Sequence, residues 1–534
     1  MVALKSSAHS KNITSYKTRK TKKVTKENAI TDLISGGGAV FLTMMAAYLL
    51  IFFYKLLLAR NLGAEEYGLF EMFITILGFI AVIAGLGFTN SVARFIPLYL
   101  SKSKAFLSGY MKSVLTYHLF SSIFASIILF LLADNLTSFF NFPETFTTLL
   151  YILALMIPLH TFSKLFQKII ISHKKVLLGK LGQEVIYNGV ILLGVLVLLL
   201  SNLSLINVVF VLVLANLAMF LYYLVLIIPL SKKTKSKTKK YEINRWVKFS
   251  IPLLFVGILS KFLGWTDNLV IGRMLTSTDL GVYGISFSVA YYLFIGSMIF
   301  SSIFLPIMTR FYEKNKKEFK ELFMTIRNWT MLVSLTIGAV FILFAEQILL
   351  FLFGAEFVAG ANSLRVLSAF FLIANYFYFS AHILQLEDKT HKILVGDIIT
   401  LILNLAITIF LVSRIGILGA AIGSGFSFFF VRFLFYLMSR KYIKISHDYS
   451  YLFKCFVLAF GAAFSSYFVT NIILAGVSLH LVAYITVAGI FYLASLIFGL
   501  KYLRILKQQD LIVFEFVERY TKLNLSVLKR FLVK

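Results

Sequence analysis

The sequence predicts an all-α polytopic membrane protein with about fourteen transmembrane helices, in two six-helix bundles related by a pseudo-twofold repeat, plus two C-terminal helices. The chain of 534 residues is 59% hydrophobic and only 14% charged, and its mean hydropathy is +0.88. Apolar runs of about 20 residues recur along it, which is the length that crosses the hydrocarbon core of a bilayer. A transmembrane barrel would instead alternate apolar and polar residues along each strand.

The apolar runs follow one another in order, separated by short polar connections. Their approximate positions are 37–58, 69–92, 113–133, 147–168, 181–200, 205–229, 249–271, 283–306, 328–350, 364–384, 394–413, 416–438, 452–472 and 478–500. The predicted units are a basic cytoplasmic N-tail (1–36), an N-terminal six-helix bundle (37–230), a basic cytoplasmic linker (231–248), a C-terminal six-helix bundle (249–438), two extra transmembrane helices (452–500) and an amphipathic cytoplasmic tail (501–534).

The net charge of +29 is distributed unevenly over the connections. Basic residues gather in the N-tail, in the 231–248 linker and in every second loop after them, whereas the alternate loops hold few basic residues and several carboxylates. An excess of lysine and arginine marks cytoplasmic loops. We therefore expect a multi-pass protein of the cell (plasma) membrane with both termini cytoplasmic. Its basic charge then indicates contact with membrane lipids and no nucleic acid.

The two predicted bundles repeat one another at a fixed offset of 213 residues. The offset pairs charged and glycine positions in the first and fifth spans of each bundle: Arg60 with Arg273, Glu66 with Asp279, Gly68 with Gly281, and Glu184 with Asp397. A six-span repeat begins and ends on one side, so both copies enter from the cytoplasm. This arrangement is typical of parallel repeats related by an axis along the membrane normal.

Polar residues form one stripe on the helix at 181–200 and another on the helix at 394–413. The first stripe contains Gln183, Glu184 and Asn188, and the second contains Asp397 and Asn404. Positions three, four, seven and eight apart lie on one helix face. Such stripes either bind neighbouring helices through hydrogen bonds or line a polar lumen, and both interpretations stay open here.

Charged residues within the other spans are further lumen candidates. Lys261, Asp267 and Asn268 share a broad arc of the helix at 249–271. Because a charge at the bilayer centre is costly, these residues should face the bundle interior or a wet cavity. A structural ion pair with a neighbouring helix is the alternative. Lys55 and Arg94 lie near helix ends, where snorkelling to the interface is the competing interpretation.

The sequence offers little room for enzymatic chemistry. The connections are too short to hold a soluble catalytic domain, and no phosphate-binding loop or metal-ligand spacing occurs. The single Cys455 excludes a disulfide framework. We therefore predict a protein that is no enzyme and needs no cofactor, while the identity of any coupling ion remains open.

The segment "LLLARNLGAEEYGLF", followed by "GLGFTNSVARFIPLY", resembles the N-terminal signature of the polysaccharide (oligosaccharide) flippase family. That family, which includes O-antigen flippase-like proteins, belongs to the multidrug/oligosaccharidyl-lipid/polysaccharide exporter (MOP) superfamily. In the second half, Asp267, Gly272, Leu275, Gly281 and Tyr283 are similar to a further element of the family. Nearly the whole chain fits the fourteen-span plan of the family.

The resemblance implies a flippase that moves a lipid-linked oligosaccharide from the cytoplasmic to the outer leaflet by alternating access. Its substrate would be a saccharide on a polyprenyl phosphate or pyrophosphate, used for cell-surface polysaccharide or glycoprotein synthesis. Lys261, Lys55 and Arg94 would then face the phosphate, and the amide side chains would face sugar hydroxyls. Glycan-assembly enzymes are possible partners. The alternatives are a drug/cation antiporter of the same superfamily and a membrane glycan polymerase or ligase.

Overall fold

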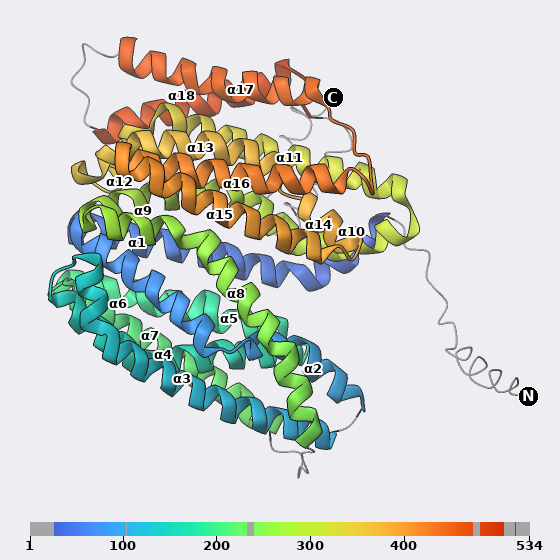
Figure 1. Ribbon diagram of the computed structural model, residues 1–534. Helices are drawn as coiled ribbons and strands as arrows, with labels where there is room; N and C mark the ends of the chain where they lie inside the picture. Colours follow the sequence, from blue (N-terminus) through green and yellow to red (C-terminus); the bar gives the residue numbers. More distant parts are fainter. Residues whose placement is uncertain (1–25, 103, 232–239, 474–480, 507–517, 519–534) are drawn as a thin grey trace, which may run out of the picture.

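The computed structural model describes residues 26–102, 104–231, 240–473, 481–506 and 518, and every regular element among them is a helix (Figure 1). This confirms the all-α fold class. The N-tail as far as residue 25, most of the basic linker and nearly all of the predicted amphipathic tail lie outside the described residues.

The longer helices follow one another along the chain with short connections. They are α1 (Lys26–Ala84), α2 (Phe88–Lys102), α3 (Lys104–Phe140), α4 (Thr145–Ser172), α5 (Val176–Leu181), α6 (Asn188–Leu200), α7 (Leu205–Ser231), α8 (Lys240–Met274), α9 (Ser277–Tyr291), α10 (Ile295–Lys314), α11 (Lys316–Leu343), α12 (Ala345–Leu352), α13 (Ala361–Tyr376), α14 (Ser380–Leu386), α15 (Thr390–Ile415), α16 (Ile417–Ser439), α17 (Tyr449–Phe468) and α18 (Leu481–Tyr502). The π-helix Gly182–Tyr187 joins α5 to α6, and the 3₁₀ turn Ala355–Gly360 precedes α13.

Within the described residues, twelve helices are long and apolar enough to cross a membrane, or thirteen if the bent pair in α8 is counted as one span. The predicted spans 37–58 and 69–92 are joined in α1, whose apolar part Val40–Ala84 has 45 residues. Gly63, with φ 78° and ψ 174°, interrupts the helical backbone there, and the chain turns back on itself (Figure 1). The structure gives one span fewer than the sequence here, because the two predicted spans are joined by a helical turn and count as one helix. The total of fourteen and the two-bundle division remain predictions.

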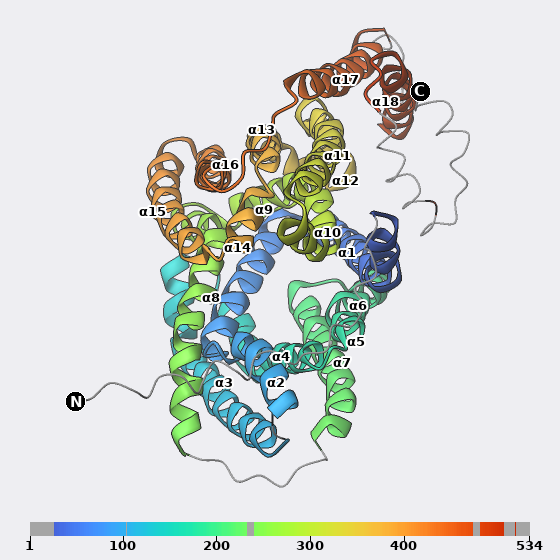
Figure 2. The same cartoon turned by 90° about the vertical axis from the view of Figure 1, so that its right-hand side faces the viewer.

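Successive helices run back and forth, so their connections gather at two ends of the molecule (Figure 1), and Figure 2 looks along many of the helices from one of these ends. One end carries the repeated motifs at 60–68 and 272–281, and we call it the motif end. The opposite end carries the lysine- and arginine-rich connections at 173–175, 314–317, 387–392 and 440–444, and we call it the basic end. The uneven charge seen in the sequence is therefore an asymmetry between two ends of the structure.

The two repeated motifs pack directly against each other at the motif end. A Cβ atom added at Gly68 would lie 1.8 Å from the carbonyl oxygen of Ser277, and one added at Gly281 would lie 2.0 Å from that of Ala64. Glycine at both positions lets the second arm of α1 and α9 approach backbone to backbone. Residues that the sequence offset of 213 makes equivalent therefore meet in space.

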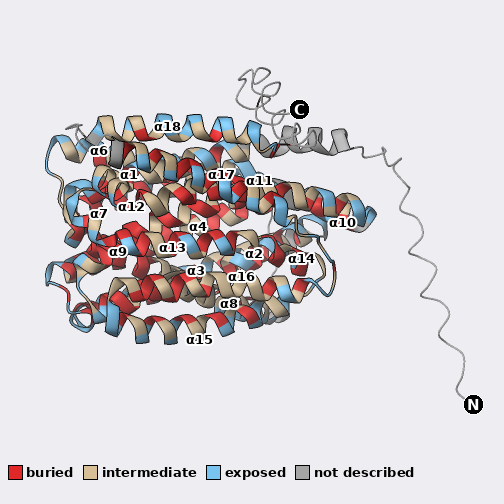
Figure 3. Ribbon diagram, turned by 90° about the horizontal axis from the view of Figure 1, so that it is seen from above, coloured by how far each residue is buried: buried red, intermediate tan, exposed pale blue. Residues whose placement is uncertain are grey.

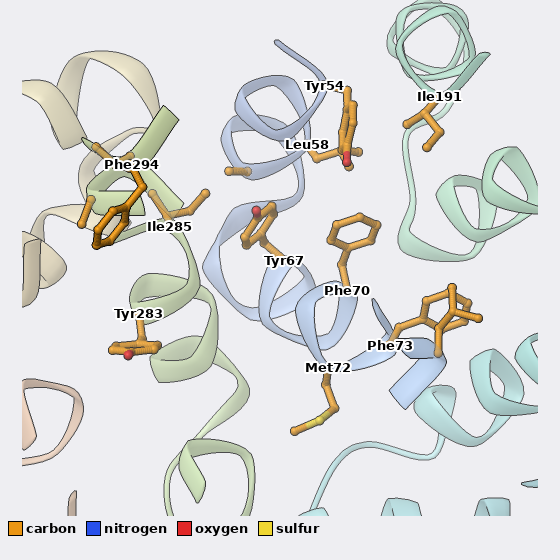
Figure 4. Packing of buried hydrophobic residues seen from close by; sticks show 14 of the residues in the cluster. Tyr54, Leu58, Tyr67, Phe70, Met72, Phe73, Ile191, Tyr283, Ile285 and Phe294 are labelled. Atoms are coloured by element: carbon orange, nitrogen blue, oxygen red, sulfur yellow. The ribbon is translucent and has the colours of Figure 1, made fainter. Parts of the chain in front are cut away.

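Large apolar and aromatic side chains of the two arms of α1 pack together near this glycine contact. Figure 4 shows Tyr54 and Leu58 on the first arm of α1 close to Tyr67 and Phe70 on its second arm. Tyr67 and Phe70 are almost completely buried. This packing holds the two arms of α1 together, and it fills the molecule between the motif end and the cavities described below.

The outer surface is apolar around the circumference of the helices. Residues buried in Figure 3 gather along the centre of the molecule, whereas the outlying helices α15 and α18 show exposed positions along their length. The most apolar stretch of α18 is only 17% buried, and Leu200 and Phe498 are 92% and 70% exposed. An apolar exterior of this extent suits contact with acyl chains, so the chain is a multi-pass membrane protein.

Candidate functional site

A cavity of about 550 Å³ lies among α1, α2, α4 and α8. Three ammonium groups share its wall: Lys164 and Lys168 from α4 and Lys261 from α8. His160, Gln167 and Tyr187 add polar atoms to the same wall. We call this space the lysine cavity. The α4 residues of its wall, from His160 to Lys168, lie in the half of that helix nearer the connection at 173–175, so this wall lies toward the basic end.

The three ammonium groups of the lysine cavity are held without direct neutralisation. Within the described part of the chain, no carboxylate lies within 4.0 Å of any of them. Lys164 donates to Oε1 of Gln183 at 2.5 Å, and Nζ of Lys261 lies 4.0 Å from the ring centre of Trp265. The charges of Lys164 and Lys261 repel one another. The cavity therefore presents a net positive surface to whatever enters it.

A second cavity, of about 340 Å³, lies among α1, α8, α9 and α16. Its wall carries the aromatic side chains Tyr48, Trp265, Phe287, Tyr291, Tyr292 and Phe428. Five polar side chains interrupt this aromatic wall: Lys55, Glu71, Asp267, Asn268 and Ser288. We call this space the aromatic cavity.

The charged groups of the aromatic cavity are already bound to protein partners. Nζ of Lys55 lies 2.7 Å from Oε1 of Glu71 and donates to Oγ of Ser288 at 3.2 Å. The hydroxyl of Tyr67 donates to the same Glu71 oxygen at 2.8 Å. Lys55 thus links the two arms of α1 to α9 from within the protein interior, which differs from snorkelling to the interface.

Asp267, from α8, also lines the aromatic cavity and is 3% exposed. Its Oδ2 atom accepts hydrogen bonds from the hydroxyls of Tyr283 and Ser424. The neighbouring Asn268 donates from Nδ2 to Oγ1 of Thr75 at 2.9 Å. Hydroxyl donors therefore stabilise this carboxylate, and no cation lies within 4.0 Å of it among the described residues.

Trp265 separates the two cavities and lines both of them. Its ring packs so closely on Gly78 that a Cβ atom there would lie 1.8 Å from Cζ3. The bend of 42° in α8 falls between Leu259 and Lys261, about one turn before Trp265. A ligand that occupies both cavities must therefore pass along this ring.

The first predicted polar stripe is placed beside the lysine cavity by the π-helix Gly182–Tyr187. The side-chain amide of Asn188 donates to the carbonyl oxygen of Glu184 at 2.9 Å, inside the widened turn. Glu184 forms the expected pair with Lys180 at 3.7 Å. Gln183 reaches the cavity through its bond to Lys164. Local π-helices are frequent at functional sites, and this one turns the stripe toward α4.

Three candidates from the sequence lie away from both cavities. Asp397 and Asn404 belong to α15, which packs on α16 and α8, and Oδ1 of Asn404 accepts from Thr408 at 3.1 Å. The guanidinium carbon of Arg94 lies 4.4 Å from the ring centre of Phe249, and its side chain is exposed. These three candidates are therefore not part of either cavity wall. The candidates that do line a cavity are Lys55, Lys261, Asp267 and Asn268, and Gln183 contacts the lysine cavity through Lys164.

Sequence reasoning missed three charged side chains that line the cavities. They are Lys164, Lys168 and Glu71. The two lysines are one helical turn apart near the end of the apolar run 147–168, which was a usable signal. Glu71 gave a weaker signal, because only the turn at Gly63 brings it opposite Lys55.

The geometry contains no arrangement for metal-dependent chemistry within the described residues, where no group of three or more His, Cys, Asp or Glu side chains could hold a metal ion. The arrangement instead offers a positively charged space and, across one shared aromatic ring, an aromatic space with paired charges.

Comparisons with known proteins agree with this arrangement of helices. The model of a family described as polysaccharide biosynthesis protein matches residues 57–362. A probable low-salt glycan biosynthesis flippase, Agl15 of Haloferax volcanii, is 24% identical over 444 residues, which cover 83% of this chain and 88% of the relative.

Solved structures share the fold at low sequence identity. The lipid II flippase MurJ, in an inward closed conformation, superposes with a TM-score of 0.66 at 15% identity, over 87% of this chain and 98% of that one. An inward-facing multidrug resistance MATE transporter of the MOP superfamily gives a TM-score of 0.60 at 14% identity, over 78% of this chain and 98% of that one.

Proposed function

The chain belongs to the polysaccharide biosynthesis protein family, which confirms the family expected from its motifs, and we propose that it is a flippase for lipid-linked oligosaccharides. In this proposal the saccharide is joined to a polyprenyl carrier through a phosphate or pyrophosphate. The protein carries this head group from the cytoplasmic to the outer leaflet of the cell membrane. Agl15, which is described as a probable glycan biosynthesis flippase, supports the proposal.

The lysine cavity is the observation that carries the proposal. A phosphate-linked saccharide is anionic and strongly hydrated, so its transfer through bare hydrocarbon is forbidding. Three ammonium groups on one wall replace water around the phosphate and form charge-assisted hydrogen bonds with its oxygens. The isoprenoid tail has no such requirement and stays among the acyl chains.

The two ends of the molecule suggest how access alternates. The lysine cavity lies toward the basic end, which the charge rule assigns to the cytoplasm together with both termini. At the motif end, the contact of Gly68 and Gly281 closes the path to the outer side. Rocking of the repeats would separate this contact while the basic end closes, which exchanges the closed and open ends. Glu184 and Asp397 would then stabilise the cations of one state or titrate with a coupling ion.

Export of cationic drugs by antiport is the rival activity within the same fold. A cationic drug in the lysine cavity would meet three unpaired ammonium groups, which disfavour it by like-charge repulsion. An anionic head group would instead be attracted by the positive charge of these lysines. The charge of the cavity therefore favours the flippase over the antiporter.

Flipping of a fluorescent lipid-linked oligosaccharide in proteoliposomes tests the proposal. We expect Lys261→Ala and Asp267→Ala each to reduce the flipping rate at least about tenfold, since a charge-assisted hydrogen bond contributes about 1.5–3 kcal/mol. Lys441→Ala, on a basic connection outside both cavities, is the control and should flip at the parental rate. Parental flipping by both cavity variants, at equal reconstituted amounts, would remove the assignment of these cavities to the substrate path.

A further inference from the structure

The two cavities that meet at Trp265 have opposite formal charge. Lys164, Lys168 and Lys261 give the lysine cavity three positive charges. In the aromatic cavity, Lys55 contributes one positive charge and Glu71 and Asp267 contribute two negative charges. One ligand that fills both spaces must therefore carry an anionic part joined to a part that tolerates carboxylates.

We propose that the aromatic cavity is a saccharide subsite, which binds the sugar nearest the phosphate and selects a neutral sugar over an acidic one. The inference rests on the proposed flippase function and adds the class of sugar to it. In the bound arrangement the phosphate lies among the lysines of the lysine cavity. The first sugar lies beyond Trp265, in the aromatic cavity.

The aromatic wall matches the apolar faces of a sugar ring. A pyranose carries C–H groups on its two faces and hydroxyls around its rim, so it packs flat on an aromatic ring. Phe287 and Tyr291 stack on each other, with ring centres 5.9 Å apart and planes 17° apart. Together with Trp265, they give the cavity flat apolar surfaces on two sides. Pockets of this kind hold a ligand through apolar area and orient it through a few polar groups.

The polar side chains of the aromatic cavity match the rim of a sugar ring. Glu71, Asp267 and Asn268 present planar oxygen and amide groups from two different helices. Such groups form paired hydrogen bonds with neighbouring hydroxyls. The bonds that Lys55, Tyr67 and the other partners make to them hold these groups in place before a ligand arrives, which reduces the ordering cost of binding.

Charge and polarity argue against other occupants of the aromatic cavity. An isoprenoid chain there would bury Lys55, Glu71 and Asp267 against hydrocarbon and would take away their water without replacing it. A uronic acid would bring a carboxylate beside Glu71 and Asp267, and like charges in a water-poor site repel strongly. A neutral sugar avoids both penalties.

Gly264 allows the aromatic cavity to be narrowed without disturbing the protein around it. It lies in α8 on the wall of this cavity, and a Cβ atom added there would meet no atom within 4 Å. The variant Gly264→Leu therefore projects a side chain into the space that the sugar would take. Gly461→Leu is the matched control, because Gly461 is a helical glycine of α17 whose added Cβ also meets nothing within 4 Å.

The experiment measures binding to the purified full-length protein by calorimetry. Three probes share one farnesyl pyrophosphate: the bare carrier, the carrier with one glucose and the carrier with one glucuronic acid. We expect the glucose probe to bind at least about tenfold more tightly than the other two, which is a difference of ~1.4 kcal/mol. Gly264→Leu should remove this advantage and leave the bare carrier unaffected, whereas Gly461→Leu should keep it. Asp267→Asn should narrow the gap between glucose and glucuronic acid.

The probes separate failure of the subsite from failure of the flippase. Equal binding of all three carriers, with affinity still dependent on Lys164 and Lys261, would overturn the saccharide subsite and keep the proposed function. Tighter binding of the glucuronic acid probe would overturn the selection for a neutral sugar. Absence of binding by every carrier, in a protein that is folded by its melting curve, would overturn both proposals.

Discussion

In the lysine cavity, Lys164, Lys168 and Lys261 face one space with no carboxylate within 4.0 Å among the described residues, whereas in the aromatic cavity Lys55 is bound to Glu71 at 2.7 Å. The difference separates two uses of a buried charge. A paired charge contributes to the fold, and its removal leaves a partner without compensation. An unpaired cluster weakens the fold through self-repulsion, and an anionic ligand can relieve that repulsion. The lysine cavity is thus arranged to bind an anion, whereas the Lys55–Glu71 pair stabilises the fold and holds Glu71 in place on the wall of the aromatic cavity.

The largest expected effect comes from removing two of the unpaired charges. Lys164→Gln combined with Lys168→Gln should lower the flipping rate of a lipid-linked oligosaccharide about a hundredfold or more, because each lost charge-assisted bond contributes about 1.5–3 kcal/mol. Reconstituted flipping assays would measure the rate. Lys174→Gln combined with Lys175→Gln is the control, since these exposed lysines lie six and seven residues beyond Lys168, in the connection to α5. Equal loss in both double variants would show that general positive charge matters and the cavity does not.

A stability comparison sharpens the contrast between paired and unpaired lysines. Lys55→Met should destabilise the protein by about 3 kcal/mol, because it leaves Glu71 buried without its cation. Adding Glu71→Gln should recover much of that loss. Lys168→Gln should leave the melting temperature unchanged or raise it, since it relieves repulsion within the cluster. Melting curves of the detergent-purified variants provide the measurement, and a loss for Lys168→Gln as large as that for Lys55→Met would contradict the comparison.

The smallest expected effect concerns the ring shared by the two cavities. Gly78→Ala places a methyl group where the Trp265 ring now lies, and overpacking of this kind costs about 1–3 kcal/mol. We expect the displaced ring to slow flipping about tenfold or less while the protein remains folded. Gly189→Ala, in α6, is the control because its added Cβ meets nothing within 4 Å. A parental flipping rate in Gly78→Ala would indicate that the position of Trp265 does not limit passage.

The sequence predicted the fold class and family because both depend on signals carried by single segments. Apolar runs of one length identify helices that cross a bilayer, and the motif around Gly63 and Gly68 identifies the family. The same local reasoning predicted that Lys261 and Asp267 face inward, because a charge within an apolar run is costly against lipid, and in the structure each lines a cavity.

The site was less predictable because each cavity is assembled from several helices. Helical periodicity shows which residues of one helix share a face, but not which other helix that face meets. The sequence offset of 213 pairs Glu184 with Asp397, yet Glu184 attracts Lys164 of the lysine cavity, whereas Asp397 lies away from both cavities on α15. Lys164 lies near the end of an apolar run, and only the arrangement of α4 and α8 around one cavity brings it to the same space as Lys261.

The glycine contact at the motif end also has a consequence for how easily the molecule can come apart there. Gly68 and Gly281 have no side chains, so the two helices meet backbone to backbone at this point, without interdigitating side chains. Helices that meet in this way can separate and return without any side chain changing its rotamer. Two hydrogen bonds also cross this end: Arg60 donates to the carbonyl oxygen of Phe351, and the backbone N–H of Ala64 donates to Glu356. These bonds must break when the end opens, so their number and strength would set the lifetime of the closed state.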